Sequence, residues 1–209
     1  MTMKNSTLRA AQTAFAVSMV GVAAGPAWAQ AGYPQRPVRM VVPFAPGGAS
    51  DFVGRIIQAR FSEELGQQIV IDNRAGAAGN IGVEVAARAN ADGYTLLLGN
   101  IGTMAINPGL YYKFPIKPVN DLIAITQLVD VPGSLVVHPS LPVKSARDLI
   151  ALAKAKPDQL SYATQGLGSP ADMAMLLFAE ATGIKAIPVP YKGGAPGMID
   201  LLAGNITMM

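Results

Sequence analysis

The chain has no cysteine and a single histidine among its 209 residues. Without cysteine no disulfide can form, so an apolar core must hold the fold by itself. The usual ligand set of a zinc site is missing for the same reason. His138 has no obvious serine or cysteine partner in the sequence, and no G-x-S-x-G segment occurs. The sequence therefore does not support catalysis by a nucleophile with a histidine base.

Charge of one sign is not concentrated anywhere either. The chain carries 16 basic and 13 acidic residues, and no basic run is interleaved with aromatic residues. Nucleic acid is therefore not an expected partner. Beyond the N-terminus, no stretch approaches the roughly 20 apolar residues that a membrane-spanning helix needs.

The N-terminus has the three parts of a secretory signal peptide. Lys4 and Arg9 precede an apolar segment at 14–24, and Ala27-Trp28-Ala29 fits a small-x-small cleavage site. We expect residues 1–29 to be removed on export to the periplasm, because the cleavage site is well formed. An N-terminal anchor helix is the less favoured alternative.

Four loops share one arrangement, in which an apolar strand is followed by glycines and then by a helix start. The first runs from Val38 to Asp51 and contains Gly47-Gly48. The others lie at 73–80, 164–170 and 191–197. The first N–H groups of a helix have no partner inside it and carry partial positive charge. Glycine lets a ligand approach them, so these loops predict binding of a small carboxylate without a metal.

Strands and helices alternate along most of the chain. Strands are expected at 38–43, 68–72, 94–98, 160–164 and 187–191, with a helix after every one of them except 94–98, and this alternation predicts parallel α/β sheets. The middle differs: 107–118 is expected to be mostly irregular, and strand-like runs at 122–129 and 134–138 to cross into a second lobe. We expect a first lobe at 30–130, a second at 131–209 and a hinge near 129–134. Residues 205–209 resemble the beginning of a strand, which predicts a C-terminally truncated chain.

The third loop leaves an enzyme open as an alternative. Gly166-Leu-Gly168-Ser-Pro-Ala171 matches the loose dinucleotide fingerprint G-x-G-x-x-G/A. The next strand ends at Tyr191-Lys192, without the acid that would bind the ribose. The alternative hypotheses are therefore a nucleotide-dependent enzyme built on this loop and a non-functional fragment of a receptor.

Five spaced motifs resemble those of the tripartite tricarboxylate transporter receptors, the TctC or Bug proteins. They lie at 43–51, 73–82, 92–96, 166–170 and 189–196, in the same order as in that family, and span essentially the whole exported chain. The resemblance implies an α/β fold of the periplasmic binding protein type II class, a two-lobe flytrap with an incomplete second lobe. It also implies a monomeric, non-enzymatic receptor without a cofactor, which delivers a carboxylate to a membrane permease.

The resemblance further implies which residues contact the ligand. From the first lobe these are Phe44, Gly47, Gly48, Ala49, Ser50, Asp51, Gly76, Ala77 and Asn80. From the second lobe they are Gln165, Gly166, Gly168, Ser169, Pro170, Tyr191 and Lys192. Two positions depart from the family pattern: Ala75 replaces a proline, and Asp172-Met173 replaces a common His-Leu. We expect Asp172 to serve the first turn of its helix rather than to set ligand preference.

Overall fold

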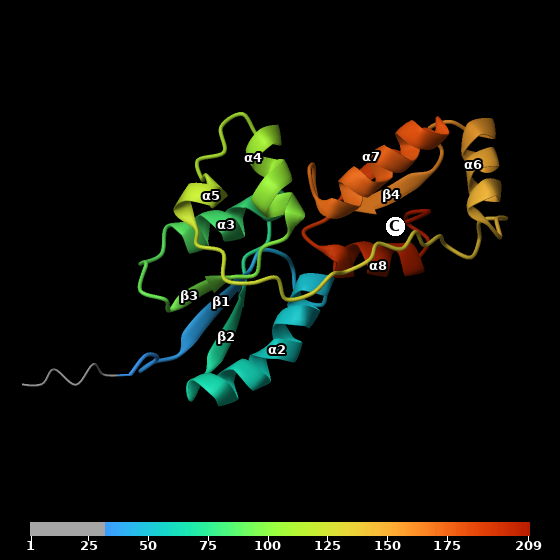
Figure 1. The fold of residues 1–209 in the computed structure, drawn as a ribbon. Coiled ribbons are helices and arrows are strands. Elements are labelled where there is room, and N and C mark those ends of the chain that lie inside the picture. Colours follow the sequence, from blue (N-terminus) through green and yellow to red (C-terminus); the bar gives the residue numbers. More distant parts are fainter. Residues whose placement is uncertain (1–31) are drawn as a thin grey trace, which may run out of the picture. The chain divides into compact units, whose positions relative to one another are not determined.

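A computed structural model describes residues 32–209 of the chain (Figure 1). The expected signal peptide lies outside the described residues. Residues 36–209 form one compact unit, and residues 32–35 belong to a separate N-terminal unit without regular secondary structure. Within 36–209, two parallel sheets are present. We call 36–121 the first-sheet region and 137–209 the second-sheet region.

The first-sheet region contains a three-stranded parallel sheet in the order β2-β1-β3, as the alternation predicts. Its strands are β1 (Val38–Val42), β2 (Ile69–Asn73) and β3 (Thr95–Leu97). The two crossover helices are α2 (Ala49–Leu65) and α3 (Asn80–Ala87). Because right-handed crossovers lead from the central β1 outward to β2 and back across it to β3, α2 and α3 cover opposite faces (Figure 1).

Packing of α2 follows from its spacing of apolar residues. Three of them, four residues apart, pack against buried Val38, Met40 and Ile69 of the sheet: Ile57, Phe61 and Leu65. Phe52 and Ile56, expected beside that stripe, are exposed instead. The helix ends at Gly66, whose left-handed φ of 63° makes it the C-cap that the sequence predicts.

The second-sheet region contains a two-stranded parallel sheet with three helices. Its elements are α6 (Ala146–Ala155), β4 (Ser161–Thr164), α7 (Pro170–Thr182), β5 (Ile187–Pro190) and α8 (Gly194–Leu202). Ser145 caps α6 by accepting a hydrogen bond from Asp148 N–H, and Gly183 ends α7 at φ 71°. Both caps agree with the sequence prediction. Tyr162 packs into one apolar cluster and its neighbour Ala163 into another, as alternation along a strand requires.

The two prolines of strand β5 lie only at positions whose backbone groups point away from β4. The N–H groups of Ile187 and Tyr191 donate to carbonyls of β4 or its flanks. Alternate positions of a strand point their backbone groups to opposite sides, so Pro188 and Pro190 fall where an N–H would point away from β4. The outer edge of β5 therefore lacks two backbone donors.

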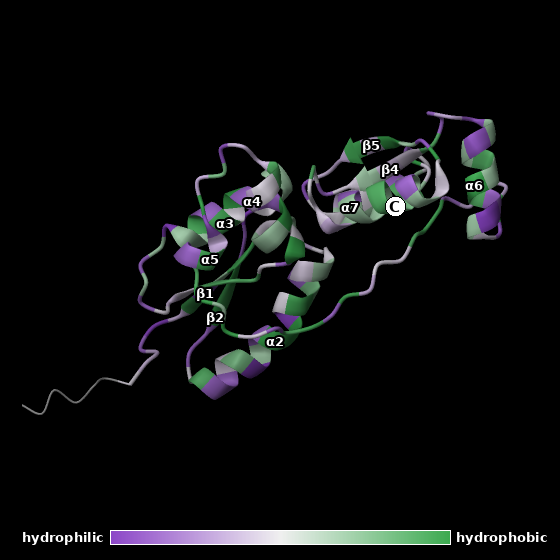
Figure 2. Cartoon of the chain, turned by 45° about the horizontal axis from the view of Figure 1, so that its top comes forward, coloured by the Kyte–Doolittle hydropathy of each residue, from purple (hydrophilic) through white to green (hydrophobic). Residues whose placement is uncertain are grey.

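The strand prediction for 122–129 is wrong, and that for 134–138 is confirmed only at 136–138, where Val137 forms an antiparallel bridge with Met208. Residues 122–136 are extended but belong to no strand, and Figure 2 shows much of this segment in hydrophobic colours. Ile123 and Ile125 are 93% and 77% exposed. Pairing begins only at Val136, which exchanges two backbone hydrogen bonds with Met209, and continues at His138, whose N–H donates to Thr207 C=O. A strand-like sequence needs a neighbouring strand, and 122–135 has none in the described part of the chain.

The expectation of a mostly irregular 107–118 is also wrong at its start. A continuous helix follows β3, consisting of a π-helical segment at Gly102–Ile106 and α4 (Asn107–Leu110). A further short helix, α5, spans Pro118–Asp121. Pro108 is the second residue of α4 and lies inside this continuous helix. Within 32–209, no helix is both long and apolar enough to cross a membrane.

Candidate functional site

The four glycine loops predicted from the sequence converge in the structure. Ala45 N–H of the first loop donates to Lys192 C=O of the fourth over 3.0 Å. A Cβ placed on Gly166 of the third loop would lie 3.2 Å from Ala78 N of the second. We call these segments, 44–50, 76–80, 165–169 and 192–195, the loop cluster. Glycine is needed at its contacts because the backbones approach closely.

Helices α2 and α8 point their N-termini at each other within the loop cluster. A Cβ on Gly48 would lie 3.5 Å from Gly194 N, and one on Gly47 would lie 3.2 Å from Ala195 Cβ. No described residue accepts a hydrogen bond from the N–H groups of Gly48, Ala49 and Ser50, or from those at the start of α8, 193–195. Two partial positive charges and a set of open N–H groups therefore meet at one place.

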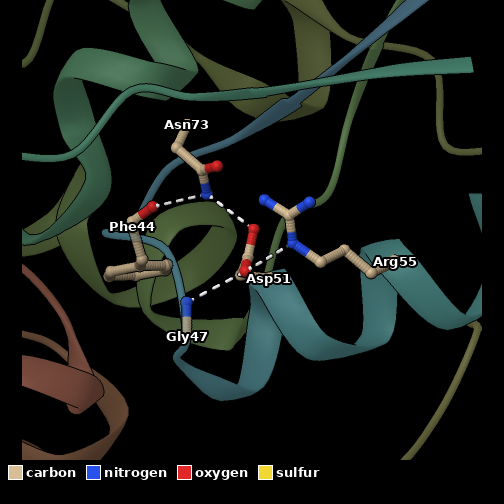
Figure 3. A network of polar contacts seen from close by, with 5 residues as sticks. All are labelled: Phe44, Gly47, Asp51, Arg55 and Asn73. Atoms are coloured by element: carbon tan, nitrogen blue, oxygen red, sulfur yellow. Dashed lines mark hydrogen bonds and ion pairs between the residues drawn. The ribbon is translucent and has the colours of Figure 1, made fainter.

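A buried carboxylate holds the first loop in shape (Figure 3). Asp51, 3% exposed, accepts hydrogen bonds from Gly47 N–H (2.9 Å), Arg55 Nε (2.8 Å) and Asn73 Nδ2 (3.0 Å). Asn73 Nδ2 also donates to Phe44 C=O. Burial acts to raise the pKa of Asp51, but these hydrogen bonds outweigh it and hold the pKa below its usual value. Asp51 thus accepts from its own loop, from its own helix and from the end of β2.

The second loop has an unusual backbone. Gly76, Ala77, Ala78 and Gly79 all have positive φ, of 133°, 47°, 53° and 93°. For the two alanines this left-handed conformation costs about 1–2 kcal/mol each. Consecutive residues of this kind can direct successive N–H groups toward one point, and strain of this kind is often found at functional sites. Asn80 follows as the first residue of α3.

The third loop, by contrast, satisfies most of its own N–H groups. The buried Ser169 hydroxyl caps α7, accepting from Gln165 N–H and Asp172 N–H, and Pro170 takes the first helical position. Gly168 N–H donates to the Asp172 carboxylate over 3.0 Å. Asp172 is 4% exposed and also accepts from Tyr162 Oη. It therefore serves the loop and the first turn of α7, as expected, and leaves Gly168 N–H unavailable.

Sequence reasoning missed a fifth segment that meets the loop cluster, the helix start after β3. Asn100 and Thr103 form a closed turn, in which each backbone N–H donates to the other side chain over 3.0 Å. A Cβ on Gly102 would lie 3.0 Å from Gly168 C=O. Buried Asn107 donates to Ala78 C=O and to Asn80 Oδ1, and its own Oδ1 has no hydrogen-bond partner in the described structure. No sequence pattern predicted the π-helical segment between Asn100 and Asn107. Gly99-Asn100, which follows a strand as the other glycine loops do, was the signal that could have indicated this fifth segment.

The remaining predicted residues have mixed roles. Tyr191 Oη donates to Asp200 over 2.6 Å, and burial together with this bond raises the pKa of Tyr191 to about 12. Lys192 contributes its backbone carbonyl, as described above. The side-chain amide of Gln165 lies close to Gly194, since a Cβ there would be 3.5 Å from Nε2. Phe44 is buried beneath Gly79, whose Cβ would lie 3.1 Å from its ring.

Groups that would indicate metal or nucleophilic chemistry do not assemble here. Residues 32–209 contain no cluster of metal-ligating side chains. His138 does have a serine neighbour, contrary to the sequence expectation: its Nδ1 lies 2.7 Å from Ser140 Oγ. Ser140 N–H also donates to that ring nitrogen, so the pair forms a local turn away from the loop cluster.

Known proteins match this chain closely. A family model described as "Tripartite tricarboxylate transporter family receptor" matches residues 53–209. Protein BugT of Bordetella pertussis is 41% identical over 175 residues, which cover 83% of this chain and 54% of BugT. The chain thus spans about half the length of the curated relatives that it matches.

Solved structures agree in fold and in sequence. The periplasmic binding protein BugD has a TM-score of 0.82 and 37% identity over 85% of this chain and 59% of its own. MatC of Rhodopseudomonas palustris, solved with bound malate, has a TM-score of 0.80 and 32% identity over 85% of this chain and 60% of its own. An R. palustris protein solved with adipate has a TM-score of 0.77 and 39% identity over 85% of this chain and 59% of its own. The fold is that of these periplasmic binding proteins.

Proposed function

The chain belongs to the tripartite tricarboxylate transporter receptor family, and from that membership we propose that it captures a small organic carboxylate outside the cytoplasm. In this proposal it delivers the solute to a membrane permease and catalyses no reaction. Relatives solved with malate and adipate support the class of ligand. An N-terminal signal peptide at 1–29 would direct the export.

The observation that carries the proposal is the meeting of the α2 and α8 N-termini. Each helix end favours an anion by about 0.3–1 kcal/mol at exposed sites and by up to about 2 kcal/mol where partly buried. Two such ends in contact repel each other unless negative charge lies between them. Open N–H groups at Gly48, Ala49 and Gly194 would hold a carboxylate, and the Ser50 hydroxyl, which makes no hydrogen bond within the described structure, would add a donor.

The remaining candidate residues divide into contact and positioning roles. We assign the strained N–H groups of Ala77 and Ala78 and the Gln165 amide to the far end of the ligand. Asp51, Ser169 and Asp172 are positioning residues, because their polar atoms are occupied by their own loops. The Asp51 carboxylate does not oppose an anion strongly, since it is paired with Arg55.

The nucleotide-dependent alternative has less support. A pyrophosphate needs free N–H groups in the glycine loop. In the Gly166–Gly168 loop the N–H groups of both glycines donate to side chains of the same loop or helix, Thr164 and Asp172.

A ligand-dependent thermal melt tests the proposal. Malate, adipate, benzoate, amino acids and NAD would each be added to the protein, and a ligand at about 100 times its Kd should add about 2.7 kcal/mol of stability. We expect one of the carboxylates, and neither the amino acids nor NAD, to raise the Tm.

A variant that blocks the open N–H groups sharpens the test. Gly48 has φ of −83°, which valine adopts readily, and a side chain there would cover Gly194 N–H. Gly48→Val should abolish the ligand-induced rise in Tm while the melt of the free protein stays close to wild type. Gly109→Ala, whose added Cβ meets nothing within 4 Å, is the matched control and should bind normally. Carboxylate binding that survives Gly48→Val would refute the site.

A further inference from the structure

The third glycine loop keeps few backbone donors for a ligand. The N–H groups of Gln165, Gly166 and Ser169 donate to acceptors within the loop or at the end of β4, and Gly168 N–H donates to Asp172. Little donor capacity therefore remains for an anion. Gly168 nevertheless has a positive φ of 84° and lies in close contact with another element, which indicates a different use of this loop.

That element is the helix after β3, whose C-terminal end lies against the third loop. Tyr111 N–H donates to Asn107 C=O over 2.9 Å, and residues four apart in this way lie on the same side of a helix. Tyr111 Oη donates to Leu167 C=O over 2.8 Å. A Cβ on Gly168 would lie 2.5 Å from Asn107 Oδ1 and 2.8 Å from Leu110 Cδ2. We call these contacts of residues 107, 110 and 111 with residues 167 and 168 the latch.

Asn107 connects the third loop with the second. Its side chain is fully buried, and its Nδ2 donates to Ala78 C=O and to Asn80 Oδ1. Its Oδ1, which has no hydrogen-bond partner in the described structure, lies instead close to Gly168. The Cα–H groups of a glycine make weak hydrogen bonds with such oxygens. A single buried side chain is therefore in contact with both loops.

The Tyr111 hydroxyl is held in the form that donates. Burial and the nearby Asp172 carboxylate raise the pKa of Tyr111 above its usual value of 10.0, so the hydroxyl keeps its proton at neutral pH. Within the described residues, two hydrogen bonds connect the first-sheet region with the second-sheet region. They are this bond to Leu167 C=O and the one from Ala45 N–H to Lys192 C=O.

We propose that the latch holds the first-sheet and second-sheet regions closed and thereby regulates the affinity of the carboxylate site. Asn107 holds the carbonyl of Ala78, whose N–H is assigned above to the far end of the ligand, so a closed latch keeps the second loop in one conformation. A binding conformation that is less populated lowers the apparent affinity in proportion. Tyr111 and Asn107 are positioning residues, because they act through the loops. The effect on affinity rests on the proposed function, whereas the closure does not.

A distance measurement on the free protein tests the latch without any ligand. The chain has no cysteine, so nitroxide labels on an Asn90→Cys, Glu180→Cys double variant, both at exposed positions, report the separation of the two regions by pulsed EPR. Tyr111→Phe should lower the ratio of closed to open populations about two- to tenfold, the effect of one lost hydrogen bond. Tyr112→Phe, at a side chain that is 97% exposed, is the matched control and should leave the distances unchanged. Equal distributions for the two variants would overturn the proposal.

A glycine variant opens the latch by another route. Gly168→Ala places a Cβ against Asn107 Oδ1 and should shift the distances in the same direction as Tyr111→Phe. Gly66→Ala is the matched control, because Gly66 also has a positive φ, 63°, and a Cβ there meets nothing within 4 Å. Equal shifts in the two alanine variants would contradict the latch, since backbone strain alone would then explain them.

Titration with malate and adipate separates the latch from the proposed function. By calorimetry, Tyr111→Phe should weaken whichever of the two binds the wild type by about two- to tenfold, and Tyr112→Phe should not. Should neither bind the wild type, the carboxylate proposal fails for these ligands, and the EPR comparison still decides whether the latch exists. Unchanged affinity in a Tyr111→Phe variant with an opened latch would overturn the regulation of the site by closure.

Discussion

Asp51 and Asp172 occupy the same position in two different helices. Each is the third residue of its helix, and each accepts a hydrogen bond from the glycine N–H four residues earlier, Gly47 or Gly168. Helices α3 and α8, in contrast, have no acidic residue in the first turn. Two loops are thus shaped by a carboxylate of the protein itself, whereas the N–H groups of the α8 loop have no such carboxylate.

Removal of the Asp51 charge should destabilise the fold. In Asp51→Asn, the amide cannot accept from Gly47, Arg55 and Asn73 together, and a lost buried hydrogen bond to a charged group costs about 1.5–3 kcal/mol. Urea denaturation of both proteins measures the difference in unfolding free energy. Asp130→Asn, at an exposed position, should change stability by less than about 0.5 kcal/mol. Equal stability of the two variants would contradict the role of the network.

The contribution of Asp51 should depend on pH in a defined direction. Its folded pKa lies below the usual value of 3.8, so the unfolded state binds the proton first as the pH falls. The stability that it contributes is therefore complete well above pH 3.8 and decreases as the pH falls through the folded pKa. Unfolding free energies of wild type and Asp51→Asn, measured from pH 7 to pH 3, should converge at the acid end. A difference that grows toward low pH would contradict this account.

The two serine caps should differ in strength. Ser145 is exposed and accepts one bond, from Asp148 N–H, so Ser145→Ala should cost about 1 kcal/mol. Ser169 is fully buried and also interacts with Gln165 N–H and the Thr164 hydroxyl. Because these groups would remain buried without a partner, Ser169→Ala should cost about 1–3 kcal/mol more than Ser145→Ala. Thermal or urea denaturation of both variants measures the two losses of stability. Equal losses would contradict the prediction and would mean that the third loop rearranges to pair the groups that Ser169 leaves.

Two glycine-to-alanine changes should have opposite effects. A Cβ on Gly82 of α3 would lie 2.7 Å from Pro43 Cα and 3.0 Å from Arg74 C=O, which are backbone atoms that cannot turn aside. Gly82→Ala should therefore destabilise by about 1–3 kcal/mol. At Gly109 of α4 the space is open, and alanine should stabilise by up to about 1 kcal/mol through its higher helix propensity. Tm measurements decide the sign of each effect.

Much of the fold could be predicted because local patterns and packing agree. The apolar run at β1, the spacing of Ile57, Phe61 and Leu65, and the glycine caps Gly66 and Gly183 all predicted the observed elements. The run at 122–129 has the same apolar character but no strand beside it. Pairing is a property of two segments, and one segment alone does not reveal whether its partner is present.

The candidate site was only partly visible for a related reason. Glycine loops after strands are recognisable, and the structure brings all four together. The sequence does not show which N–H groups remain open, because that depends on the side chains that occupy them. Asp172 and Ser169 close the third loop in this way. The helix at 101–110 was missed because Pro108 lies inside it, and proline normally indicates that a helix does not continue.

The prolines of β5 determine the direction in which its sheet can be extended. Pro188 and Pro190 remove backbone donors from the outer edge, so a strand-shaped segment from a neighbouring molecule finds no regular ladder there. On the opposite side, beyond β4, Met208 already bridges to Tyr162 and Val137. In concentrated solution, self-association by edge pairing is therefore not expected to start at β5, and any growth of this sheet is restricted to the side of residues 137 and 208.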